Sequence, residues 1–171
     1  MRSIAMLGRL TLAGLLLGAG AASAQATKAQ TAVATAMRGA KHTPLADAIQ
    51  TATSSGKPLS ARYEFEDGKL KLSVFVEKDG KYSELFFDHM TGKVAQVDKI
   101  TDGDDMKDAK AQSKASAKAT KSLGSALTKA LAENPGYIAV DVTPIVEGKK
   151  AVAEVTLMKD GQFKTATEPI A

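Results

Sequence analysis

The 171-residue chain contains no cysteine and no tryptophan, only two histidines, and 5% aromatic residues. Without cysteine the protein can form neither a disulfide nor a thiolate metal site, so a hydrophobic core must hold the fold together. The same absence excludes a lipid anchor on an acylated cysteine. Most of the few aromatic residues lie between positions 63 and 87, and they offer no row of stacking platforms for single-stranded nucleic acid.

The sequence also lacks a hydrophobic run long enough to cross a membrane, which takes about 20 apolar residues. The stretch Leu10–Gly20 is apolar but shorter. Arg2 and Arg9 precede this stretch, and the small residues Ala22–Ala24 follow it, as is typical of a cleaved signal peptide. We therefore expect residues 1–24 to be a signal peptide and the mature protein to be periplasmic or secreted, with no membrane span.

Neither sign of charge is in large excess. The whole chain has 23 Lys and Arg against 19 Asp and Glu, a net charge of +4. Removing Arg2 and Arg9 with the signal peptide leaves 21 basic residues against 19 acidic ones, a net charge of +2. A nearly neutral mature chain gives no support to nucleic-acid binding.

The stretch from Pro58 to Val94 has the pattern of an antiparallel meander. Asp67-Gly68 and Asp79-Gly80 are two-residue turn sequences between runs of alternating apolar residues. A short fourth strand is expected to run through Val97. Because side chains alternate between the two faces of a strand, one face should carry Leu59, Ala61, Tyr63, Phe65, Leu70, Leu72, Val74, Val76, Ser83, Leu85 and Phe87.

A helix is predicted on each side of this meander. Before it, Thr43-Pro44 is a helix start, followed by apolar residues at helical spacing: Leu45, Ala48, Ile49 and Ala52. After it, residues 101–121 are rich in Ala and Lys, with acidic residues first and lysines later, as the helix dipole favours. Asp102, Asp104, Asp105 and Asp108 invite a Ca²⁺ site, but they lack the ligand order of an EF-hand loop, so an ordinary helix N-terminus is the favoured interpretation.

The second half of the chain repeats the first at an offset of 78 to 81 residues. Leu123, Ala126, Leu127 and Ala130 repeat the earlier helical stripe, and Asp160-Gly161 repeats Asp79-Gly80. The sequence therefore predicts an α+β fold of two tandem units, each a helix followed by an antiparallel meander, the second truncated at its C-terminal strand. The expected boundaries are 25–100 for the first unit, 101–121 for a helical linker and 122–171 for the second unit.

Three motifs resemble those of the PepSY domain: Glu66–Leu70 (EDGKL), Phe87–Val94 (FDHMTGKV) and Asn134–Gly136 (NPG). The likeness covers residues 43–100 well and 122–170 less well, because Thr165–Ile170 lacks the closing Asp and Thr-Gly-Lys-Val. The resemblance implies a small exported α+β module of the kind found in protease propeptides and in standalone envelope proteins. It also implies binding or restraint of other proteins, peptidases in particular, with no catalytic residues.

No catalytic or cofactor-binding constellation is found in the sequence. His42 and His89 are the only histidines, 47 residues apart, and neither has a second histidine or a carboxylate at zinc-site spacing. No Gly-rich phosphate loop or nucleophile motif is present. We therefore expect a non-enzymatic protein with no metal and no cofactor.

The candidate interaction face carries Phe75, Tyr82 and Phe86, which should point away from the Leu72/Val74 face. Either these aromatics bind a partner, or the second unit or the N-terminal helix covers them. The leading functional hypothesis is an exported protein-binding module, a peptidase or hydrolase inhibitor or regulator, whose partner is another envelope or secreted protein. The alternatives are a small-ligand or metal-sensing accessory protein and a purely structural envelope protein.

Overall fold

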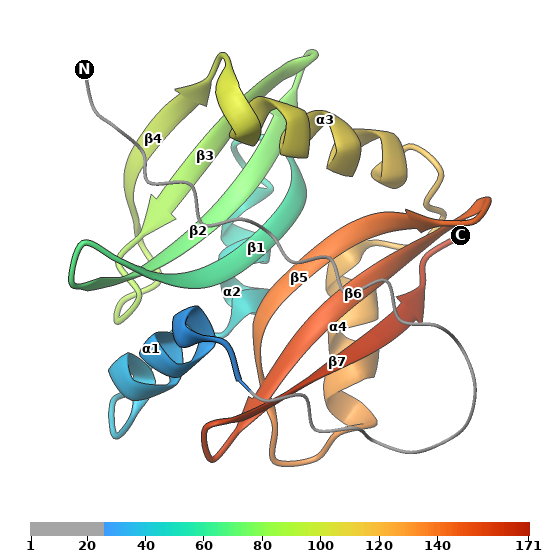
Figure 1. The fold of residues 1–171 in the computed structure, drawn as a ribbon. Coiled ribbons are helices and arrows are strands. Elements are labelled where there is room, and N and C mark those ends of the chain that lie inside the picture. The colour runs from blue at the N-terminus through green and yellow to red at the C-terminus, as the bar shows by residue number, and fades with distance from the viewer. Residues whose placement is uncertain (1–25) are drawn as a thin grey trace.

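A computed structural model describes residues 26–171, so the signal peptide predicted for residues 1–24 lies outside the described residues. Four helices and seven strands follow one another in this part of the chain (Figure 1). None of these helices is long and apolar enough to cross a membrane. In chain order the elements are α1 (Lys28–Met37), α2 (Leu45–Ala52), β1 (Lys57–Glu66), β2 (Lys69–Lys78), β3 (Lys81–Phe87), β4 (Val94–Ile100), α3 (Gly103–Ser116), α4 (Leu123–Ala132), β5 (Ile138–Glu147), β6 (Lys150–Lys159) and β7 (Gln162–Pro169).

All seven strands form one antiparallel sheet with the order β4-β3-β2-β1-β5-β6-β7. The predicted Asp-Gly turns close the β1–β2 and β2–β3 hairpins. Asp67 and Gly68 have φ values of 51° and 75°, and Asp79 and Gly80 have 53° and 71°. Positive φ at both central residues is the conformation of the tight hairpin turn that suits the twist of the strands.

The prediction of two helix-plus-meander units is wrong: the described chain is a single sheet-rich domain. β1 and β5, the first strands of the two halves, pair with each other at Ala61↔Val142 and Arg62↔Asp141. One apolar cluster then runs through both halves, from Leu72 and Val74 to Val155 and Leu157. The sequence repeat indicated the hairpins, but it could not show that the two meanders join edge to edge.

The main core lies between one face of the sheet and the helices α1, α2 and α4, with α2 and α4 behind the strands in Figure 1. The predicted stripes of α2 and α4 are buried there, including Ala48 and Leu127 at 0% exposure. One member of the predicted strand face lies elsewhere. A register irregularity between Pro58 and Ser60 moves Leu59 to the opposite face of the sheet.

Helix α3 covers part of that opposite face. It occupies the stretch predicted as a linker, and its acidic first turn and Lys114 in the last turn agree with the predicted dipole arrangement. However, one side of α3 packs on the sheet, where Ala109 joins a second apolar cluster with Leu59, Phe75 and Ile100. The helix is therefore a structural layer as well as a connection (Figure 1).

Candidate functional site

The predicted aromatic face is largely internal. Phe75 is only 1% exposed, because α3 covers it, and Tyr82 packs against the same cluster in a half-buried position. Phe86 is half-buried, with the ammonium of Lys71 6.0 Å from its ring centroid. The alternation of side chains between the two faces was predicted correctly here, since Phe75 does point away from Val74. Burial was one of the two expected alternatives, but the expected cover was the second unit or the N-terminal helix. The structure shows that α3 is the cover, which was not expected because its Ala/Lys composition gave little apolar periodicity.

The face beneath and beside α3 instead carries a cluster of charges around Arg62. Its Nε atom lies 2.9 Å from Oε1 of Glu64, as an ion pair without hydrogen-bond geometry, and its Nη2 atom lies 3.9 Å from Oε1 of Glu84. The guanidinium also lies over the ring of Phe75, 5.0 Å from the centroid. Pairing across the sheet places Asp141 opposite Arg62. One cation is thus surrounded by several carboxylates.

Burial dominates the electrostatics of this cluster. It raises the pKa of Glu84 to about 7, although a hydrogen bond with Ser73 and the charge of Arg62 both act to lower that pKa. Burial lowers the pKa of Arg62, but the carboxylates of Glu64, Glu84, Asp141 and Asp105 outweigh it, and the net shift is upward. Within residues 26–171, no histidine or activated nucleophile accompanies these groups. The two ion pairs of Arg62 lie within β1, to Glu64, and between β1 and β3, to Glu84.

A second polar contact lies under α3, between Ser60 and Gln112. The hydroxyl of Ser60 donates to Oε1 of Gln112 at 2.8 Å, while Nε2 of this glutamine has no hydrogen-bond partner among the described residues. Gln112 is 1% exposed. Sequence reasoning missed both contacts, because their partners lie on strands and a helix that are far apart along the chain.

The edge strand β4 is the most accessible regular element. Six of its seven residues are exposed, and only Ile100 is buried. Val94 and Val97 are 38% and 56% exposed. Among residues 26–171, β4 pairs with β3 alone, so the backbone groups along its other edge have no strand partner. Such an edge can accept an additional strand from another chain.

The opposite edge, β7, is better protected. The carbonyl oxygen of Ile170, just after β7, accepts hydrogen bonds from the backbone N–H groups of Thr120 and Lys121. Lys129 on α4 forms an ion pair of 2.6 Å with Glu168, and Pro169 removes one backbone donor from the strand. The two edges therefore differ, and β4 is the one open to pairing.

A groove with a volume of about 240 Å³ lies on one face of the sheet, across β2 and β3 and next to Val97 of β4. Its apolar floor is formed by Val76, Leu85 and Val97, and its charged residues are Lys78, Lys81 and Asp79. Lys99 points to the same face of β4 as Val97, because it is two residues further along the strand. The groove thus joins an apolar floor to a rim on which lysines outnumber carboxylates.

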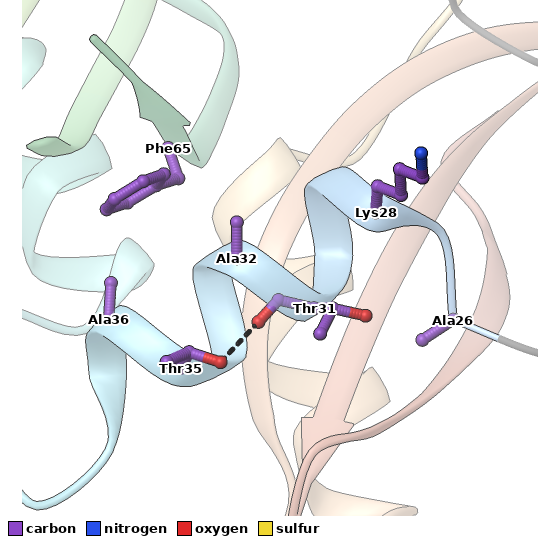
Figure 2. Close-up of a pocket in the computed structure, with 7 residues that line it drawn as sticks. All are labelled: Ala26, Lys28, Thr31, Ala32, Thr35, Ala36 and Phe65. Atoms are coloured by element: carbon purple, nitrogen blue, oxygen red, sulfur yellow. Dashed lines mark hydrogen bonds between the residues drawn. The ribbon is translucent and has the colours of Figure 1, made fainter. Parts of the chain in front are cut away.

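A larger hollow of about 520 Å³ lies between α1 and the end of β1 (Figure 2). Phe65, 41% exposed, faces Ala32 and Ala36 across it. The hydroxyls of Thr31 and Thr35 donate to backbone carbonyls of α1 and its cap, so they offer little to a ligand. This hollow provides apolar contact but few groups that could select a particular molecule.

The acidic residues at positions 102–108 form the start of α3. Asp104 makes an ion pair of 2.7 Å with Lys107 one turn later. In the described part of the chain, no group of three or more His, Asp or Glu side chains is arranged to hold a metal ion. Asp102 is the N-cap of α3 and Asp104 and Asp105 lie in its first turn, as the favoured interpretation of a helix N-terminus predicted.

Comparisons with known proteins find one similar solved structure. No family model matches the chain. No curated protein matches it either. A solved structure from Clostridium difficile, described as a candidate lipoprotein, is similar at 16% identity and a TM-score of 0.35, covering 73% of this chain and 93% of that chain. At this identity and score the likeness carries no conclusion about function.

Proposed function

We propose that this protein is an exported, non-enzymatic protein-binding module that captures an extended segment of its partner along β4. The observation that carries the proposal is the open edge of β4, with six exposed residues and two exposed valines. An extended segment can complete the hydrogen-bonding groups of this edge and place alternate side chains in the groove beside it.

The chemistry of the groove defines the partner segment. Val97, which is 56% exposed, would contact an apolar side chain, while Lys78, Lys81 and Lys99 would attract carboxylates at the rim. A segment with an apolar residue and, two positions further along, a carboxylate meets both requirements, because residues two apart leave an extended strand on the same side. We take the partner to be another exported protein.

The PepSY-like motifs support the same class of function. That resemblance implies modules that bind or restrain peptidases, so an exported peptidase or other hydrolase is the proposed partner class. The leading sequence feature for export remains the predicted signal peptide at residues 1–24.

Export is tested by Ala24→Leu. A large residue at this position should block cleavage, because the signal peptidase requires a small side chain there. Intact-mass analysis should show that the normal chain begins near Gln25 while the variant retains its leader. A variant chain that still began at Gln25 would contradict the assigned cleavage site.

The partner-binding proposal is tested with Val97→Glu. The probe is a soluble fusion protein that ends in an extended segment with valine and glutamate two positions apart on the same face, compared with one in which lysine replaces the glutamate. We expect the acidic probe to bind the unmodified mature protein and to protect β4 amides from hydrogen exchange. Val97→Glu should weaken that binding at least about tenfold, since it removes an apolar contact and repels carboxylates.

Ile138→Glu is the matched control, because Ile138 is 46% exposed on β5, away from the β4 edge. It should bind the acidic probe as the unmodified protein does. Both substitutions are at exposed positions and should change the free energy of unfolding by only about 0.5 kcal/mol. Equal binding by the two variants, or protection of β7 instead of β4, would overturn the proposed site.

A further inference from the structure

The two histidines of the chain, 47 residues apart in sequence, lie side by side in the fold. The Nδ1 atoms of His42 and His89 are 3.2 Å apart, and the ring centroids are 5.2 Å apart at an interplanar angle of 37°. His42 belongs to the connection between α1 and α2, and His89 to the turn between β3 and β4. Both side chains are half-buried, so solvent reaches the pair.

A backbone contact determines which nitrogen of His42 carries its proton. Nε2 of His42 lies 3.0 Å from the carbonyl oxygen of Met37, which can only accept a hydrogen bond. In the neutral ring the proton is therefore on Nε2, and Nδ1 presents its lone pair to His89. A backbone carbonyl that binds the distal N–H of an imidazole is the usual second-shell partner of a metal-binding histidine.

The surrounding backbone fixes the two rings relative to each other. The N–H of Thr43 donates to the carbonyl of His89 at 2.8 Å, and the hydroxyl of Tyr63 donates to the carbonyl of Thr43 at 2.6 Å. In the turn itself, Oδ1 of Asp88 accepts from the N–H groups of Met90 and Thr91, both at 2.9 Å. These hydrogen bonds hold the α1–α2 connection against the β3–β4 turn in the ligand-free protein.

We propose that His42 and His89 form a binding site for a divalent transition-metal ion of the zinc class, with Nδ1 of each ring as a ligand. Two nitrogens bound to tetrahedral zinc at about 2.0–2.1 Å are about 3.3 Å apart, which agrees with the 3.2 Å separation here. Imidazole is a preferred ligand for this class of ion. Two water molecules would complete the tetrahedron, so the site should bind more weakly than a site with three or four protein ligands.

Metal binding requires only a change of tautomer at His89. In the metal-free protein, Nδ1–H of His89 donates to the lone pair of His42 Nδ1. When the ion binds, that proton leaves to solvent and His89 takes up a proton on Nε2, so both rings remain neutral and both Nδ1 lone pairs face the ion. The bound ion would then link the α1–α2 connection to the turn that leads into β4.

The test uses tag-free mature protein, because an affinity tag would add further histidines. Zn²⁺ is titrated by calorimetry and by following the imidazole proton signals in NMR spectra. With only two histidines in the chain, both sets of signals report on this site. We expect one ion per chain, simultaneous shifts of both imidazoles and a thermal midpoint that rises by several degrees at saturating Zn²⁺.

His42→Gln and His89→Gln should each weaken Zn²⁺ binding at least about tenfold, since a single imidazole remains. The matched control is Asp104→Asn with Asp105→Asn, which removes two carboxylates of the 102–108 cluster and should leave Zn²⁺ binding unchanged. Unmoved imidazole signals in the unmodified protein would overturn the proposal without any variant. Binding that survives the loss of both histidines, or that disappears in the aspartate variant, would also overturn it.

Discussion

Replacing Phe75 by alanine is expected to lower the free energy of unfolding by about 3–5 kcal/mol, the usual range for a buried phenylalanine. The ring is 1% exposed and lies at the centre of the cluster beneath α3. Its removal leaves a cavity between the sheet and Ala109, and it also takes away the aromatic face on which the guanidinium of Arg62 rests. The loss should appear as a large fall in the midpoint of urea or thermal unfolding.

Phe86→Ala provides the matched comparison, because Phe86 lies on the same face of the neighbouring strand, cross-strand from Ser73, but is only half-buried. Its truncation removes less buried apolar surface, and we expect a loss of about 1 kcal/mol. Phe75→Leu should recover part of the stability lost in Phe75→Ala, since it refills most of the cavity. Equal melting curves for Phe75→Ala and the unmodified protein would show that α3 does not cover this face in solution.

The hairpins could be predicted from sequence because their determinants are local. The Asp-Gly pairs at positions 67–68 and 79–80 favour the positive φ values of a tight turn without help from distant residues. The alternation that places Val74 and Phe75 on opposite faces is equally local. The register irregularity that places Leu59 on the α3 face of the sheet could not be predicted from the sequence, because neither Pro58 nor Ser60 indicates its position.

The global arrangement could not be predicted, because it depends on pairing between distant strands. Two halves with the same order of elements can form separate domains or a shared sheet, and only the contact of Ala61 with Val142 decides between them. Likewise, the sheet-facing side of α3 is made of Ala109, Gln112 and Ala115, small or polar residues that do not form a recognisable apolar stripe. The histidine pair was missed for the same reason, since 47 residues separate its members.

Glu84→Gln is expected to change how stability depends on pH. Burial raises the folded-state pKa of Glu84 from 4.5 to about 7. Between these two pH values the folded protein holds a proton on Glu84 that the unfolded chain releases, so stability from this group is present below pH 4.5 and is lost as the pH rises through about 7. The full effect is on the order of 3 kcal/mol, at about 1.4 kcal/mol for each pKa unit.

Glutamine keeps the shape of the protonated carboxyl and cannot ionise. The variant should therefore match the unmodified protein near pH 4.5 and be more stable than it at pH 8, with a difference that grows across the interval. Urea unfolding at a series of pH values measures this difference, and taking the difference cancels the titration of the other carboxylates. Glu66→Gln is the control, because the Glu66 side chain is 46% exposed in its ion pair with Lys71 and should matter by no more than about 1 kcal/mol.

The sign of the result at pH 8 tells which force governs the charge cluster. If desolvation of Glu84 dominates, glutamine stabilises, and Arg62 retains Glu64 at 2.9 Å as its nearest carboxylate. If instead the ion pair with Arg62 dominates, as close Coulomb attraction would require, Glu84→Gln destabilises at every pH above 4.5. The 3.9 Å separation of the Arg62–Glu84 pair, longer than that of the Arg62–Glu64 pair, favours desolvation. A destabilised variant at pH 8 would contradict the raised pKa and would make Glu84 the ionic partner that holds β1 to β3 across β2.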